Sequence, residues 1–156
     1  MHYNTQFPEA FTDPCERTPM NEAITIPTAT LKPKEERRIQ RGHVWAYRTE
    51  FQSLPELADG DLVDVYSSQR RFVGRGFYQS QGGIAVRILS RHQETIDTTF
   101  FQTRFQSALA MRKALYPDSN TYRWLFAEVD GVPGLVADRF GGVVSVQSSC
   151  AFYVAW

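Results

Sequence analysis

Residues 62–89, LVDVYSSQRRFVGRGFYQSQGGIAVRIL, predict three consecutive strands and with them the architecture of the first half of the chain. Leu62–Tyr66 alternates and is rich in β-branched residues, and a loop then leads into Phe72–Tyr78. A pair of glycines next turns the chain into Ile84–Leu89. Short strands at this spacing are typical of a small closed or partly closed barrel.

On the N-terminal side, two more strands are predicted at Ala29–Lys32 and Val44–Phe51, separated by a short helix over residues 33–41. A proline suits the first turn of this helix, and Gly42 suits the position after its end because it tolerates positive φ. Residues 1–25 are polar, contain three prolines and have no periodicity, so we expect a disordered tail there.

A second unit begins near Asp97, which can cap a helix whose apolar residues recur at helical spacing. Leu115 is the last of these residues, and Pro117 lies just beyond it. Strands at Tyr122–Val129 and Val143–Gln147 follow, around a segment rich in turn residues.

These elements make the chain α+β and β-rich. A small pseudo-barrel is expected in residues 26–94, followed by an incomplete α+β unit in residues 95–156 with one long helix and two or three strands. The chain has 156 residues, of which 42% are hydrophobic, so it can bury a core. No apolar run could span a membrane and no secretory signal is present, so a cytoplasmic protein is expected. Cys15 and Cys150 lie near opposite ends, which predicts free thiols.

Positive charge is concentrated in residues 32–48, KPKEERRIQRGHVWAYR, although the chain has no net charge. On a helix, four cations at i, i+3, i+4 and i+7 would share one face: Lys34, Arg37, Arg38 and Arg41. Aromatic rings follow directly, from His43, Trp45 and Tyr47. Cations bind phosphates and rings stack on unpaired bases, so this stretch indicates an RNA partner. The alternative is a solvated helix followed by a core strand.

Motifs for cofactors and metals are weak. Gly74-Arg75-Gly76 resembles the start of a dinucleotide-binding loop, but Gln79 stands where a third glycine is needed and no helix follows. Glycines inside a strand more often mark a bulge or a close backbone approach, which the neighbouring Arg75 and Tyr78 allow to be to RNA. The three histidines are isolated from other ligands, so no metal site is predicted.

Three carboxylates, Glu128, Asp130 and Asp138, could converge to act as an acid and base or to hold a metal. A structural role is favoured, because Asp130 begins an Asp-Gly turn and Asp138 can pair with Arg139 before the turn at Gly141. An intact enzyme that uses the three carboxylates remains one hypothesis.

Several of these stretches resemble a known family. Residues 34–51, with RGHVW at 41–45, together with GRGFY at 74–78 and VRIL at 86–89, resemble the PUA domain that opens the large-subunit ribosomal RNA methyltransferase I family. Residues 128–141, EVDGVPGLVADRFG, resemble the central domain that joins PUA to the methyltransferase domain in that family. The match covers residues 29–147 in the right order and spacing.

The resemblance implies a cytosine-C5 methyltransferase of 23S ribosomal RNA that uses S-adenosylmethionine, with its cofactor loop and nucleophilic cysteine in a C-terminal domain. This chain stops before that domain, so no catalytic or cofactor-binding residue is expected and the chain alone is predicted to be inactive. Val44 departs from the family, which usually has proline there, and the sequence after Gln147 also departs. Cys150 is not carried over as the nucleophile.

We therefore predict the RNA-binding region of such a methyltransferase, with ribosomal RNA as the partner. The residues expected to bind RNA are Lys32, Lys34, Arg37, Arg38, Arg41, Gly42, His43, Trp45, Arg75, Gly76 and Tyr78. The unfinished second unit is expected to leave strand edges and the apolar tail at 152–154 without partners, which favours self-association. A competing hypothesis is a protein-interaction module that pairs with a separate catalytic chain.

Overall fold

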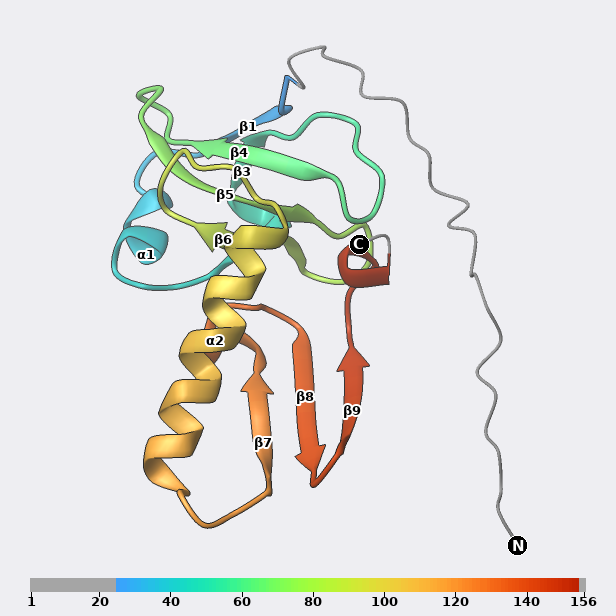
Figure 1. Cartoon of the computed structure of the whole chain (residues 1–156). Coiled ribbons are helices and arrows are strands. Elements are labelled where there is room, and N and C mark those ends of the chain that lie inside the picture. The colour runs from blue at the N-terminus through green and yellow to red at the C-terminus, as the bar shows by residue number, and fades with distance from the viewer. Residues whose placement is uncertain (1–24, 155–156) are drawn as a thin grey trace, which may run out of the picture.

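The structure is a computed structural model that describes residues 25–154 (Figure 1). The disordered tail expected for residues 1–25 and the free thiol expected at Cys15 lie outside these residues, apart from Thr25. The described chain contains two sheets and two α-helices, consistent with the predicted α+β, β-rich fold with a pseudo-barrel. No helix within residues 25–154 is long and apolar enough to cross a membrane.

The first sheet has six strands in the order β2-β6-β5-β4-β1-β3. It curls into a half-barrel, seen in the upper part of Figure 1. Neighbouring strands are antiparallel except for β1 and β4, which are parallel. The strands are β1 (Thr28–Leu31), β2 (Trp45–Tyr47), β3 (Phe51–Ser53), β4 (Leu62–Tyr66), β5 (Phe72–Tyr78) and β6 (Ile84–Ser90). The alternation in residues 62–89 thus predicted the three central strands correctly.

Helix α1 (Glu36–Gln40) closes one side of the half-barrel through Ile39, which is fully buried. The prediction of a helix over residues 33–41 was wrong in extent. Residues 33–35 form a turn in which Lys34 has a φ of +76°, so this residue cannot belong to a right-handed helix. Gly42 has a φ of +114° and ends the helix as expected.

The strand predicted at Val44–Phe51 is interrupted by the short helix η1 (Arg48–Glu50). The cause is Glu50, whose carboxylate accepts a hydrogen bond from the backbone N–H of Tyr47 at 2.9 Å and pairs with Arg38. Glu50 is buried, so these partners offset the cost of removing its charge from water.

The second unit packs helix α2 (Thr98–Leu115) beside a three-stranded antiparallel sheet in the order β7-β8-β9 (Figure 1). Asp97 caps the helix as predicted, because its Oδ1 accepts from the N–H of Phe100 at 2.8 Å. The remaining elements are β7 (Thr121–Phe126), η2 (Ala127–Asp130), β8 (Leu135–Phe140) and β9 (Val143–Ser148).

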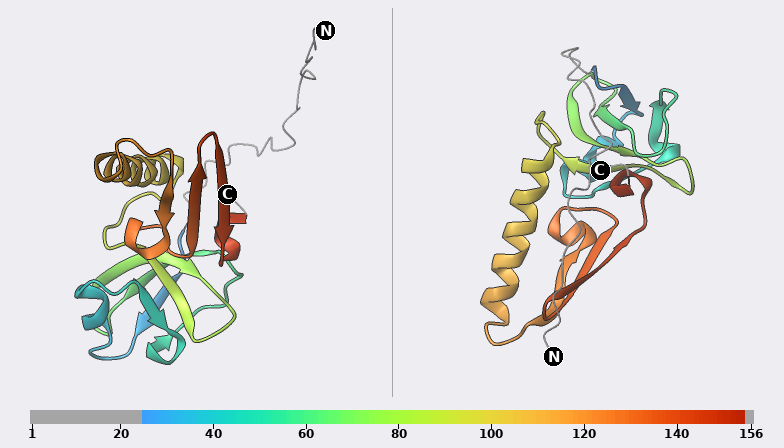
Figure 2. Two further views of the ribbon diagram at one scale, coloured as in Figure 1. Left: turned by 90° about the horizontal axis from the view of Figure 1, so that it is seen from below. Right: turned by 45° about the vertical axis from the view of Figure 1, so that its right-hand side comes forward.

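The end of the described chain, η3 (Ala151–Val154), returns to the first sheet, as both views in Figure 2 show. Phe152 is 1% exposed and stacks on Phe77 with ring centroids 4.6 Å apart. The expectation of an unpartnered apolar tail at 152–154 was therefore wrong for Phe152, because burying this ring against β5 removes it from water. Cys150 is buried and forms no disulfide with any described residue.

Candidate nucleic-acid interface

Three of the predicted cations project from the α1 region into solvent. Lys34, Arg37 and Arg41 are exposed, and within residues 25–154 their side chains form no ion pair or hydrogen bond. Arg37 and Arg41 lie one helical turn apart, joined by the backbone hydrogen bond from Arg41 N to Arg37 O at 3.1 Å. These guanidinium and ammonium groups can bind phosphates without first breaking an internal contact.

Arg38, the fourth predicted cation, is held by the fold. Its guanidinium pairs with Glu50, lies 5.1 Å from the centroid of the Tyr47 ring, and approaches Nδ1 of His43 to 3.5 Å. Arg38 therefore neutralises a buried acid and orients His43, and its charge is largely satisfied within the protein.

Trp45 joins the first unit to the second. Its indole N–H donates to Oε1 of Glu128 at 2.9 Å, and Arg87 donates to the same oxygen at 2.8 Å. The guanidinium of Arg87 also lies 5.9 Å from the Trp45 ring centroid. The rings of His43 and Trp45 meet edge to face, with centroids 6.5 Å apart. The two units are thus connected by one carboxylate that receives two donors from the first sheet.

A hollow of about 340 Å³ opens beside this junction. It is lined by Arg41, Gly42, His43, Val44, Trp45 and Glu128. Val44, where the resembled family usually has proline, is fixed because its carbonyl accepts from Ile88 N at 2.8 Å. A cation, two rings and a carboxylate therefore face one open space.

A second hollow, of about 400 Å³, adjoins the first at Val44. Its polar lining residues are Ser90, Arg91, His92, Glu94 and Arg104. Arg91 reaches toward the first hollow, since a Cβ placed on Gly42 would lie 3.8 Å from its Nη2. We call the two hollows together the junction groove.

Arg104 lines the groove, but its guanidinium is engaged in contacts within the protein. It donates to the carbonyl of Leu89 at 2.9 Å, and its guanidinium lies 3.5 Å from the centroid of the Phe100 ring. Burial lowers the pKa of Arg104, since the charged form is partly removed from water. Sequence reasoning did not identify Arg91, His92 or Arg104. Arg91 and His92 could have been noticed because they directly follow β6.

The remaining residues that were predicted to bind RNA form contacts within the protein. Arg75 pairs with Asp64 through two hydrogen bonds of 2.7 and 2.9 Å, and this partner raises its pKa. Gly76 is buried, and a Cβ there would collide with the carbonyl of Arg87, so this glycine allows β5 and β6 to approach each other closely.

Tyr78 and Lys32 are also engaged. The hydroxyl of Tyr78 accepts from Arg48 at 3.1 Å, and the ammonium group of Lys32 donates to the carbonyl of Thr49 at 2.7 Å. Four of the predicted residues therefore line the junction groove: Arg41, Gly42, His43 and Trp45. Arg37 lies one helical turn before Arg41.

The three carboxylates considered for catalysis do not converge. Asp130 pairs with Arg112 at 2.6 Å, Asp138 pairs with Arg123 at 2.9 Å, and Glu128 lies at the unit junction. The proposed pair between Asp138 and Arg139 was wrong, because Asp138 and Arg123 are register partners on β8 and β7. Within the described chain, no group of three metal-ligating side chains occurs.

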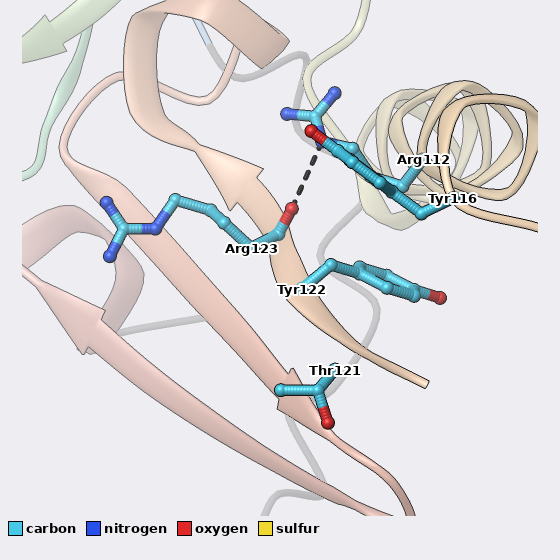
Figure 3. Close-up of a pocket in the computed structure, with 5 residues that line it drawn as sticks. All are labelled: Arg112, Tyr116, Thr121, Tyr122 and Arg123. Atoms are coloured by element: carbon cyan, nitrogen blue, oxygen red, sulfur yellow. Dashed lines mark hydrogen bonds between the residues drawn. The ribbon is translucent and has the colours of Figure 1, made fainter. Parts of the chain in front are cut away.

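Another hollow, of about 250 Å³, lies between the end of α2 and β7 (Figure 3). Arg112 donates to the carbonyl of Arg123 at 3.1 Å across it, in addition to its pair with Asp130. The arginines that line this hollow are therefore already neutralised, unlike Arg37 and Arg41.

Comparison with known proteins supports the resemblance found in the sequence. Residues 29–91 match the family of PUA-like domains. Ribosomal RNA large subunit methyltransferase I of Alteromonas mediterranea is 36% identical over 121 residues, which cover 75% of this chain and 30% of that protein. The protein of the same name from Shewanella denitrificans is 36% identical over 124 residues, which cover 75% and 31%. Ribosomal RNA large subunit methyltransferase of Deinococcus radiodurans is 33% identical over 129 residues, covering 78% and 31%.

Solved structures have the same fold. A structure described as a SAM-dependent methyltransferase from Streptococcus mutans aligns with a TM-score of 0.73 at 20% identity, over 83% of this chain and 35% of that one. A methyltransferase complexed with SAH aligns with a TM-score of 0.74 at 20% identity, over 83% and 34%.

The curled sheet and the family match define a protein with a PUA-like domain, which is followed here by a second α+β unit. Over its matched residues the chain is similar to ribosomal RNA large subunit methyltransferase I proteins, in agreement with the resemblance seen in the sequence, and it spans about a third of the length of these relatives.

Proposed function

We propose that this chain is an RNA-binding region and that the surface formed by α1 and the junction groove contacts RNA. The proposal is carried by three exposed cations, Lys34, Arg37 and Arg41, whose side chains have no partner within residues 25–154, and by the hollow that Arg41 lines together with His43 and Trp45. Free cations attract phosphates, and rings offer a surface for unpaired bases. The names of the relatives favour ribosomal RNA as the partner. A cytoplasmic location is part of the same proposal.

We propose that methyl transfer from S-adenosylmethionine is carried out in the relatives by the part of their chains that has no counterpart in the matched residues. The described residues do not fit a cofactor cradle, because Gly74-Arg75-Gly76 lies inside β5, where Gly76 is packed against Arg87. We therefore assign RNA binding, and no catalytic step, to residues 25–154.

A matched pair of charge reversals tests the RNA surface. Arg37→Glu and Lys113→Glu change the net charge equally, and both residues are exposed on helices, but Lys113 lies in the last turn of α2. Binding to a labelled RNA hairpin with a single-stranded loop, measured by fluorescence anisotropy, should weaken several-fold for Arg37→Glu and remain near wild type for Lys113→Glu. Equal effects of the two substitutions would refute the assigned surface.

A second candidate function, self-association, is favoured by β9, which is an edge strand of the second sheet within residues 25–154. All six residues of β9 are exposed, including Val143 at 66% and Val146 at 61%, and none of them carries a charge. Two identical uncharged strands can pair antiparallel without repulsion between like charges. We infer that a second copy of the chain is the partner that β9 fits.

A further inference from the structure

We propose that the first hollow of the junction groove holds one unpaired nucleobase, and that Glu128 selects a base with an exocyclic amino group, cytosine or adenine. This inference rests on the proposed RNA-binding function and adds a specificity residue from the second unit. The volume of about 340 Å³ falls within the range of small-molecule sites.

The carboxylate of Glu128 has one oxygen engaged and one left for a ligand. Oε1 accepts from both Trp45 and Arg87, whereas Oε2 accepts no hydrogen bond within residues 25–154. The side chain is 27% exposed and lines the hollow, so a ligand can reach it. Arg87 neutralises part of the charge and, together with Trp45, fixes the orientation of the carboxylate.

A carboxylate can only accept hydrogen bonds, and it therefore matches an amino group. Cytosine presents an N4 amino donor where uracil presents the O4 acceptor, and acidic side chains accept from cytosine N4 in known complexes. With its O4 at this position, uracil would face the carboxylate with two acceptors and no proton between them. Comparing cytosine with uracil therefore tests the effect of exchanging the amino group at position 4 for a carbonyl oxygen.

The surroundings of the hollow suit the rest of a nucleotide. Arg41 lines the hollow and Arg91 reaches over Gly42 beside it, so two cations can take the flanking phosphates. His43 and Trp45 supply planar surfaces within the same hollow. A single strand, whose bases are not paired, is the form of RNA that can place a base there.

Binding of the whole chain to ten-nucleotide oligo(C) and oligo(U) at pH 7.5 tests this inference. Oligo(C) should bind roughly tenfold more tightly, the size expected for a hydrogen bond to a charged group. In Glu128→Gln, the amide oxygen can still accept the hydrogen bond from Trp45, whereas the amide NH₂ now presents a donor to the base. The preference for oligo(C) over oligo(U) should therefore fall or reverse.

Asp138→Asn is the matched control, because it makes the same carboxylate-to-amide change in a residue that does not line the groove. Its ratio of oligo(C) to oligo(U) affinity should equal that of the wild type. Salt-dependent binding with equal affinities for the two oligomers, or a ratio unchanged in a folded Glu128→Gln, would overturn the inference and leave the proposed function standing. Absence of binding to both oligomers and to the RNA hairpin would overturn both.

Discussion

Phe77 on β5 and Phe152 in η3 stack with their ring planes within 7° of each other and their centroids 4.6 Å apart. These residues are 75 positions apart in the sequence, and their contact joins the end of the described chain to the first sheet. Phe101 of α2 lies 6.0 Å from the Phe152 centroid, so the same core includes both units.

Replacing Phe152 by alanine should destabilise the protein by about 3–5 kcal/mol, the cost of deleting a buried aromatic ring. Urea unfolding followed by tryptophan fluorescence measures this change. Phe140→Ala is the control, because Phe140 is exposed and its loss should change the free energy of unfolding by less than about 0.5 kcal/mol. Similar costs for the two substitutions would show that Phe152 does not occupy this core.

Arg75→Met should act on stability rather than on RNA affinity. The substitution leaves the buried Asp64 without its two hydrogen bonds from Arg75, which should cost roughly 3 kcal/mol. Differential scanning fluorimetry should therefore give a lower melting temperature, while the folded protein binds the RNA hairpin as the wild type does. If Arg75→Met were as stable as the wild type but bound RNA more weakly, Arg75 would have to be assigned to the RNA-binding surface.

Acid should weaken the protein through Asp59 and Asp138. Hydrogen bonds from Ser80 lower the pKa of Asp59, and a hydrogen bond from Arg123 lowers the pKa of Asp138. Because both pKa values are lower in the folded state, the stabilisation is complete above the ordinary carboxyl pKa and is lost as the pH falls through the folded-state values.

The free energy of unfolding, obtained from urea titrations, should therefore decrease between about pH 5 and pH 2. The double variant Asp59→Asn/Asp138→Asn should show a shallower decrease, since neither amide titrates. An identical acid dependence in wild type and variant would contradict the role of these two carboxylates.

Self-association through β9 predicts a concentration-dependent mass in light scattering. Val143→Lys/Val146→Lys places like charges on the strand that would pair with its copy, so the variant should remain monomeric at concentrations where the wild type associates. Lys113→Glu provides a control away from this edge. A wild-type mass that is monomeric throughout would exclude this interface.

The sequence predicted the first sheet well because its signals are local. Alternation and glycine turns in residues 62–89 gave β4, β5 and β6, and the capping Asp97 gave the start of α2. The pair of Asp64 and Arg75 was not predicted, and Arg75 was expected to bind RNA instead; in the structure the two residues are opposite each other in the register of β4 and β5.

Long-range contacts could not be predicted in the same way. The positive φ of Lys34, the pairing of Arg38 with Glu50 and the burial of Phe152 all depend on how separate elements meet. The junction groove combines Arg41 from the first unit with Glu128 from the second, and no local pattern places these two residues together.

The salt dependence of RNA affinity tests the central claim most directly. In the variant Lys34→Ala/Arg37→Ala/Arg41→Ala, the slope of the logarithm of the binding constant against the logarithm of salt concentration should fall by about 2, since each cation that contacts a phosphate contributes roughly 0.7. A folded variant whose slope and affinity both equal those of the wild type would contradict the claim that these cations bind RNA.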